Sequence, residues 1–211
     1  RKSRIMNISY AITVCNERSE IEKLIGFLIE NKQPDDEIVV LFDTNNGTDD
    51  VESFLDTIAS HICLRKSPFN FHFADWKNKL NSYCTKDYIF QIDADEIPAQ
   101  DLIDSLHSII KQEVDVILIP RENTVKGLTN EHIKNWGWKV DKMGRVNWPD
   151  YQWRLYRNDS SVKWVNKVHE KLDGFKTFST LPSGEEYGML FLHHPKNIKR
   201  QEKQNELYNT L

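Results

Sequence analysis

The chain has 211 residues, of which 39% are hydrophobic and 28% are charged. A chain of this length can bury one substantial core, so we expect a single domain over residues 1–211. Because 32 Asp and Glu residues outnumber 28 Lys and Arg residues, the net charge is −4, which argues against a nucleic-acid partner.

Apolar residues follow alternating strand-like and helix-like spacings up to Pro120. The pattern predicts strands at 8–14, 37–42, 62–64, 88–92 and 114–119, and helices near 19–29, 51–58, 74–84 and 102–110. Alternating strands and helices of these lengths are typical of an α/β fold, a mostly parallel sheet with helices on both faces. Such sheets bind ligands at the carboxyl ends of their strands.

After Pro120 the composition changes towards aromatic residues and glycine. Every tryptophan except Trp76 lies between Trp136 and Trp164. We therefore expect residues 121–195 to form a smaller elaboration of antiparallel strands and loops on the same domain. The polar residues 196–211 are expected to form a terminal helix or tail.

The strongest chemical signal is an apolar strand that ends in acidic residues. Residues 88–92 are followed at once by Asp93, Asp95 and Glu96. Carboxylates at the carboxyl end of a central strand repel one another unless a cation lies between them. Mg²⁺ or Mn²⁺ bridging a diphosphate is the natural occupant of such a site. The alternative is a solvated acidic turn that caps a helix beginning near Gln100.

Polar residues also follow the first and second predicted strands. Thr13, Asn16 and Glu17 lie at the end of the first, where short polar side chains can hydrogen-bond a base or a ribose. Asn16 or Ser19 could instead cap the following helix. Asp43 ends the second strand, and its carboxylate can accept a hydrogen bond from a base N–H or a ribose hydroxyl. The sequence after Asp43 is a turn and helix start on either interpretation.

Together these segments resemble the family 2 glycosyltransferases with the GT-A fold, in particular bacterial-type transferases with NE, DADE and RLYR…HE motifs. The likeness covers roughly residues 8–194. It implies a Rossmann-like GT-A domain in which residues 1–120 bind the nucleotide sugar and residues 121–195 bind the acceptor. The matching segments are 13–17, Asp43 with 47–49, 93–96, 154–157 and 168–170.

The resemblance also implies roles for individual residues. Asp95 is expected to coordinate the metal, and Asp93 to face the ribose or the metal. His193, or else its neighbour His194, is the implied further ligand, the alternative being a pair of structural histidines. The implied nucleotide-sugar ligands are Thr13, Asn16, Glu17, Asp43, Asn78, Lys79, Asp93, Ala94 and Arg154.

Inverting transfer requires a general base that takes the proton of the acceptor hydroxyl, and a carboxylate is the usual choice. Asp150 matches the acid of the family's ED pattern, although Pro149 stands where that pattern has Glu. Glu170 is the second candidate, and either carboxylate could instead bind the acceptor or stabilise the fold. Arg154 is expected to hold the diphosphate or to brace a carboxylate, unless it is a solvated surface residue.

The tryptophans indicate an acceptor site, because the C–H faces of sugars stack on indole rings. A tryptophan in a small β region is more often part of a core, so we expect only one or two to touch the acceptor. Trp148 and Trp153 are the predicted contacts.

The sequence thus predicts a metal-dependent, inverting transferase that moves a hexose from a nucleoside-diphosphate sugar to a glycan, a lipid-linked sugar or a protein. UDP is the expected nucleotide by analogy alone. A sugar-phosphate nucleotidyltransferase is the alternative among enzymes, but no Gly-rich phosphate loop follows the first strand. A non-catalytic carbohydrate-binding module is the alternative of another class, and it leaves Asp93 and Asp95 unexplained.

The number and spacing of the cysteines indicate in which cellular compartment the protein is expected. Cys15, Cys63 and Cys84 are an odd number at wide spacings, so we expect reduced thiols and a cytoplasmic location. No segment reaches the ~20 apolar residues of a transmembrane span. A peripheral contact with a membrane is compatible with both features.

Overall fold

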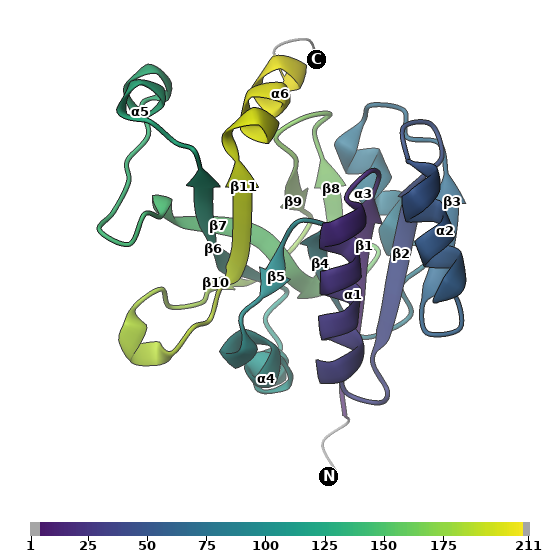
Figure 1. Cartoon of the computed structure of the whole chain (residues 1–211). Coiled ribbons are helices and arrows are strands. Elements are labelled where there is room, and N and C mark those ends of the chain that lie inside the picture. Colours follow the sequence, from purple (N-terminus) through teal and green to yellow (C-terminus); the bar gives the residue numbers. More distant parts are fainter. Residues whose placement is uncertain (1–4, 209–211) are drawn as a thin grey trace.

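The computed structural model describes residues 5–208, and the first half of this range alternates strands and helices as the sequence predicts (Figure 1). Each strand and helix predicted there has a counterpart, and only β5 lacks a predicted one. The elements are β1 (Ile8–Val14), α1 (Arg18–Asn31), β2 (Glu37–Asp43), α2 (Asp49–Thr57), β3 (Cys63–Ser67), α3 (Phe73–Asn81), β4 (Tyr88–Asp93), β5 (Ile97–Pro98) and α4 (Gln100–Ile109).

The second half contains β6 (Val116–Lys126), α5 (Asn130–Trp136), β7 (Val146–Arg157), β8 (Lys163–Val165), β9 (Lys171–Asp173), β10 (Phe178–Thr180), β11 (Leu192–Asn197) and α6 (Ile198–Tyr208). β6 is longer than the predicted strand, because residues 121–126 pair with β11, and Arg121 and Asn123 also pair with β7. α6 begins later than the predicted helix, since Lys196 and Asn197 belong to β11. Residues 209–211 of that predicted helix lie outside the described residues.

Within the described residues, nine strands form one sheet in the order β3-β2-β1-β4-β7-β6-β11-β5, with β10 also paired to β6. β1, β2, β3 and β4 are parallel to one another, whereas β7 is antiparallel to both β4 and β6. β10 and β11 are parallel to β6, and β5 is antiparallel to β11. The predicted mostly parallel sheet is confirmed, and β7 is an antiparallel strand within it.

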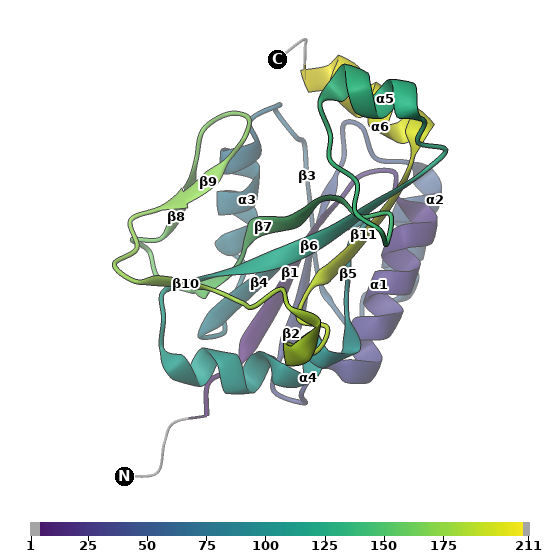
Figure 2. The same cartoon turned by 90° about the vertical axis from the view of Figure 1, so that its left-hand side faces the viewer.

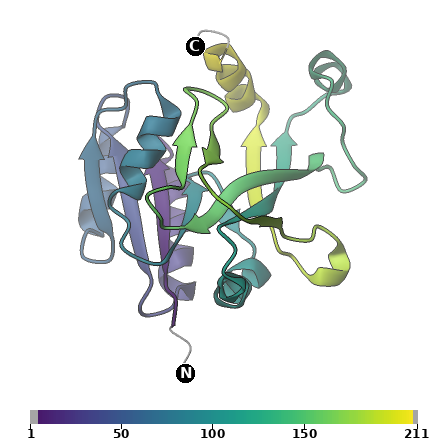
Figure 3. The same ribbon diagram turned by 180° about the vertical axis from the view of Figure 1, so that it is seen from behind.

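Apolar residues on both faces of the sheet are covered by other elements. On one face, Tyr10 of β1 packs in a core with Leu24 of α1 and Leu106 of α4. On the other, Leu80 of α3 and Trp164 of β8 share a second core. Figure 2 shows these two layers on opposite sides of the sheet, and Figure 3 shows α3 and the β8–β9 pair in front of it. The two layers fix the strands whose carboxyl ends carry the predicted site.

The β1–α1 turn is closed by a carboxylate. Glu17 occupies the N-cap of α1, so neither Asn16 nor Ser19 caps the helix, contrary to that alternative. The Glu17 side chain instead accepts hydrogen bonds from the backbone N–H of Cys15 (2.8 Å) and of Asn16 (3.0 Å). The carboxylate is therefore fixed at the carboxyl end of β1.

The helices are too short to span a bilayer. The longest helix of residues 5–208 is α1, with 14 residues, whereas a span requires ~20. None of the helices in this part of the chain has the length and apolar character of a membrane-crossing segment.

Candidate active site

A cleft of about 940 Å³ lies at the carboxyl ends of β1, β2 and β4 and extends to β6, β7, β11 and α6. This is the edge at which a parallel α/β sheet binds ligands. The predicted site residues that line the cleft are Thr13, Asn16, Glu17, Asp43, Asp93, Ala94, Asp95, Asp150, Trp153, Arg154 and Glu170. The fold thus gathers side chains that are widely separated in the sequence.

Two predicted nucleotide ligands on α3 do not line this cleft. Asn78 donates from Nδ2 to the carbonyl of Trp164 (2.8 Å) and accepts from its N–H at Oδ1 (2.9 Å). Lys79 donates to the hydroxyl of Ser67 at the end of β3. Both side chains therefore connect α3 to neighbouring strands.

A predicted metal ligand and a predicted acceptor contact also lie outside the cleft lining. His193 has its Nδ1 2.7 Å from Glu122 Oε2 and is half exposed. Trp148 packs edge-on against Phe191, and Arg145 stacks on the Trp148 ring at 4.3 Å. The contacts of both residues are therefore with neighbouring side chains.

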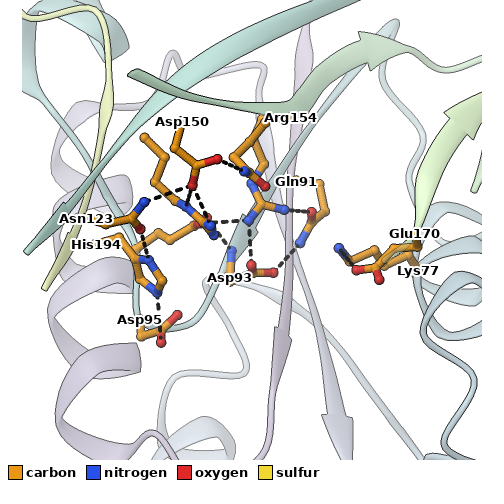
Figure 4. A network of polar contacts seen from close by, with 12 residues as sticks. Lys77, Gln91, Asp93, Asp95, Asn123, Asp150, Arg154, Glu170 and His194 are labelled. Carbon is orange, nitrogen blue, oxygen red and sulfur yellow. Dashed lines mark hydrogen bonds and ion pairs between the residues drawn. The ribbon is translucent and has the colours of Figure 1, made fainter. Parts of the chain in front are cut away.

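Asp93, at the end of β4, is held by a buried guanidinium. Arg154 of β7 donates to Asp93 Oδ2 (2.5 Å), Gln91 Oε1 (2.5 Å) and Glu96 Oε1 (2.6 Å). Gln91 Nε2 in turn donates to Asp93 Oδ1 (3.0 Å), so both carboxylate oxygens have partners (Figure 4). Burial opposes ionisation of Asp93, but the charges of Arg154 and Lys77 hold its pKa well below the usual range.

Glu96, the last acid of the DADE segment, joins two arginines. Its side chain is inaccessible to solvent, and its Oε1 accepts from Arg121 Nη1 (3.1 Å) as well as from Arg154. Its Oε2 accepts from the backbone N–H of Asp93 (3.0 Å). Ala99 occupies the N-cap of α4. The alternative of a solvated acidic turn capping this helix is therefore wrong.

Arg121 also holds Asp150. Its Nε (3.0 Å) and Nη2 (2.8 Å) donate to Asp150 Oδ2, which accepts from Asn123 Nδ2 as well (2.8 Å). Gln152 Nε2 donates to Asp150 Oδ1 (2.7 Å). Burial opposes ionisation of Asp150, but the charge of Arg121 and these hydrogen bonds lower its pKa. Asp150 is therefore a firmly ionised carboxylate with four hydrogen bonds.

Asp95 lies on the other side of Asp93 from Gln91 (Figure 4). Its Oδ2 is 3.3 Å from His194 Nε2 and 3.4 Å from Arg200 Nη2. Burial opposes ionisation, but the hydrogen bond to His194 and the charges of His194 and Arg200 lower the pKa of Asp95 to about 2. The His194 ring is oriented by Asn123, whose Oδ1 is 2.7 Å from His194 Nδ1.

The predicted metal ligands Asp93, Asp95 and His193 do not come together. Within residues 5–208, no three His, Cys, Asp or Glu side chains form a cluster that could hold a metal ion. Successive residues of β11 point to opposite faces, so His194 rather than His193 reaches Asp95. The Asp95–His194 pair fits an ion that takes its remaining ligands from a bound diphosphate and water.

Glu170 lies beside Lys77, on the far side of Gln91 from Asp93 (Figure 4). Its Oε1 accepts a hydrogen bond from Lys77 Nζ (2.6 Å). The same Nζ lies over the Trp164 ring, 4.4 Å from the ring centroid. Lys77 is buried, and Asn78 fixes the Trp164 backbone from the same helix. The position of Glu170 in the cleft is therefore set by α3 and β8 together.

Several cleft residues were not predicted from the sequence. No local signal marked Arg121 and Asn123, because they lie beyond the strand predicted at 114–119 and look like a loop in isolation. Arg200 had no signal either, because its partner Glu17 is 183 positions away in the sequence. The unpredicted polar residues that line the cleft include Lys77, Arg121, Asn123, Lys196, Arg200 and Lys203.

The sheet and its cleft define an α/β protein that binds its ligand at the carboxyl ends of parallel strands. The sequence model of the family described as Glycosyl transferase family 2 matches residues 9–180. The chain therefore belongs to this family. No match is found among curated proteins.

Solved structures of S. aureus TarS resemble the chain in fold. TarS 1–349 matches with a TM-score of 0.61 and 14% identity over 90% of this chain and 60% of the TarS chain. The complex of TarS 1–349 with UDP-GlcNAc matches with a TM-score of 0.62 and 16% identity, over 90% of this chain and 59% of the TarS chain. The complex with UDP matches with a TM-score of 0.60 and 15% identity, over 90% of this chain and 60% of the TarS chain. The chain thus spans about 60% of the length of these TarS chains. The likeness supports the predicted GT-A fold.

Proposed function

We propose that this domain transfers a glycosyl group from a UDP-sugar to a hydroxyl acceptor. The observation that carries the proposal is the convergence of Thr13, Glu17, Asp43 and Asp95 in one cleft, at the ends of three parallel strands. The likeness to TarS in complex with UDP and with UDP-GlcNAc supports UDP as the nucleotide. Family membership favours transfer over nucleotidyl transfer or sugar binding alone.

In this proposal the nucleoside binds beside Asp43. The Asp43 carboxylate accepts from the backbone N–H groups of Asn45 (2.9 Å) and Phe69 (3.0 Å), which fixes its orientation at the cleft. Phe69 belongs to an aromatic cluster with Phe71 and Trp76, all of which line the cleft. Phe71 is 43% exposed, so its ring is available for a base to stack on.

Metal dependence is part of the proposal. Asp95 and His194 would hold Mn²⁺ or Mg²⁺, and the ion would neutralise the diphosphate as it leaves. Asp93 then acts indirectly, because Arg154 and Gln91 occupy its oxygens. Its role is to hold Arg154, which in turn binds Glu96, close to the metal-binding acid.

We assign the general base of inverting transfer to Glu170. Asp150 accepts four hydrogen bonds and its pKa is lowered, so it is a weak proton acceptor. Glu170 has one hydrogen bond, from Lys77, among those described. A general base must accept a hydrogen bond from the acceptor hydroxyl, which favours the carboxylate that has fewer hydrogen bonds within the protein.

The acceptor would bind on the β7 side of the cleft. Trp153 and Trp138 line it there and can stack on a sugar ring, whereas Trp148 does not line it. A glycan, a lipid-linked sugar and a protein remain the candidate acceptors. The single domain over residues 1–211, the cytoplasmic location and the peripheral membrane contact stay predictions.

Calorimetric and thermal titrations of UDP test the donor site, with and without Mn²⁺. We expect UDP at a hundredfold excess over its dissociation constant to add about 2.7 kcal/mol of stability when Mn²⁺ is present. Asp95→Asn should abolish this effect. Asp104→Asn is the matched control, because Asp104 is an exposed acid of α4 outside the cleft lining.

Two results would count against the proposal. Absence of binding by folded wild-type protein, with UDP, GDP and their sugars, would remove the donor site. Binding of UDP that is equally strong in Asp95→Asn would place the nucleotide away from the DADE segment.

A further inference from the structure

The end of β11 and the start of α6 bring three basic side chains to the cleft. Lys196, Arg200 and Lys203 all line it, and α6 stands at the carboxyl-end edge of the sheet, directly after β11 (Figure 1). The acids Glu17 and Asp95 line the same cleft. A basic segment therefore lies beside the acids to which we have assigned the donor and its metal.

Arg200 bridges these acids. Its Nη2 is 3.1 Å from Glu17 Oε1 and 3.4 Å from Asp95 Oδ2, and its Nη1 is 3.2 Å from Glu20 Oε1. Only 18% of the Glu17 side chain and 13% of the Asp95 side chain are exposed, so these acids are poorly hydrated. The guanidinium is the counter-ion that joins the ends of β1 and β4.

A bound metal and diphosphate would disfavour this arrangement. A divalent ion on Asp95 would repel a guanidinium that contacts the same carboxylate, because charges a few ångströms apart interact strongly near a protein surface. A diphosphate next to that ion would attract the same guanidinium, since arginine binds phosphate oxygens in a bidentate manner. The repulsion by the metal and the attraction by the diphosphate would both move the Arg200 guanidinium from Asp95 towards the diphosphate.

We propose that Arg200 exchanges partners: it neutralises Glu17 and Asp95 in the nucleotide-free protein and binds the diphosphate of the donor once metal and nucleotide are present. Lys196 and Lys203, on either side of it in the sequence, extend the same anion-binding strip. This inference rests on the proposed function, because it requires the diphosphate to lie beside Asp95.

Binding of Mn²⁺ alone and of UDP in the presence of Mn²⁺, measured by calorimetry, tests the exchange in Arg200→Gln. Loss of the Arg200 guanidinium should strengthen Mn²⁺ binding several-fold, because this cation no longer competes with the ion for Asp95. Loss of the charge-assisted contact should weaken UDP binding about 10- to 100-fold. UMP binding should weaken less, since UMP lacks the second phosphate.

Lys199→Gln is the matched control, because Lys199 is exposed on the same helix, one residue away, and does not line the cleft. It should leave both affinities within about twofold of wild type. Arg200→Lys keeps the charge and should recover part of the UDP affinity.

The exchange predicts that Arg200→Gln binds Mn²⁺ more tightly and UDP more weakly, and these opposite changes distinguish it from a structural effect. A variant that merely disturbs α6 would weaken Mn²⁺ and UDP together, and that result would overturn the exchange. Unchanged UDP affinity in Arg200→Gln, with Asp95-dependent binding in wild type, would overturn it while leaving the proposed function intact. Failure of the wild type itself to bind UDP would instead remove the proposed function.

Discussion

Glu170 and Asp150 are both carboxylates of the cleft, but they differ in their hydrogen bonds. Asp150 is held by Arg121, Asn123 and Gln152, whereas Glu170 is held by Lys77. Protonation of Asp150 would break contacts that favour its ionised form, so it is the weaker base. We predict that Glu170→Gln lowers kcat about 10²- to 10⁴-fold with little change in the KM of the donor. Steady-state kinetics of sugar transfer or of donor hydrolysis measure both constants.

Asp150→Asn should have a different kinetic signature. It breaks the Arg121 pair at the acceptor side of the cleft, so we expect it to act mainly on the KM of the acceptor. Glu122→Gln is the control for loss of an acid on the same sheet, because Glu122 pairs with His193 outside the cleft. A larger loss of kcat in Asp150→Asn than in Glu170→Gln would reverse the assignment of the base.

At the scale of elements, Asn78 joins α3 to β8. Its amide makes two hydrogen bonds with the Trp164 backbone, and Trp164 carries the Lys77 side chain on its ring. We predict that Asn78→Ala lowers the free energy of unfolding by about 2 kcal/mol and speeds hydrogen exchange of the Trp164 amide. Chemical denaturation and exchange measured by mass spectrometry or NMR report the two effects.

The same variant separates this structural role from the nucleotide-binding role that the sequence implied. Asn130→Ala, at an exposed position of α5, controls for loss of an amide and should change neither measurement. Normal stability and exchange in Asn78→Ala, together with weak UDP binding, would favour the nucleotide role over the structural one.

The elements that the sequence predicts well are those with a local signal. β1, β2 and β4 are short apolar runs that end in polar residues. In the structure β1 pairs in parallel with both β2 and β4. β6 was predicted too short, because Arg121, Glu122 and Asn123 look like a loop in isolation. They form a strand only because β7 and β11 supply partners that lie far away in the sequence.

The residues of the candidate site also fall into those with a local sequence signal and those without one. Asp43 and Asp95 could be placed at the cleft from the sequence, because each follows an apolar strand. The partners of the cleft acids could not be predicted, since ion pairs such as Arg200–Glu17 and Arg154–Asp93 depend on tertiary contacts. His193 and His194 were indistinguishable in sequence, and only the structure shows that His194, on the opposite face of β11 from His193, is the one that reaches Asp95.

At the scale of the whole molecule, Asp36 ties three parts of the N-terminal half together. Its side chain is fully buried between α1 and β2, and it accepts from the backbone N–H of Ile8 (2.8 Å) and Gln33 (3.2 Å). His107 of α4 reaches the same carboxylate, with Nε2 2.9 Å from Asp36 Oδ2. The start of β1, the α1–β2 loop and α4 therefore meet at one ion pair.

This pair should make global stability depend on pH. The hydrogen bond and charge of Asp36 raise the pKa of His107, outweighing burial and the nearby Lys111. A raised pKa means that the folded state binds the proton more tightly than the unfolded state. The stabilisation is therefore complete below about pH 6.5, the ordinary His value, and is lost as pH rises through the folded-state pKa.

Urea unfolding of wild type and His107→Gln across this range isolates the contribution. Titrating groups that do not contact His107 act equally in both proteins, so the difference between the two unfolding free energies reports the His107–Asp36 pair. We expect this difference to be largest on the acidic side of about pH 6.5 and to shrink at higher pH. A difference that stays constant with pH would mean that His107 contributes only packing, because a proton bound equally in both states cannot change the free energy of unfolding.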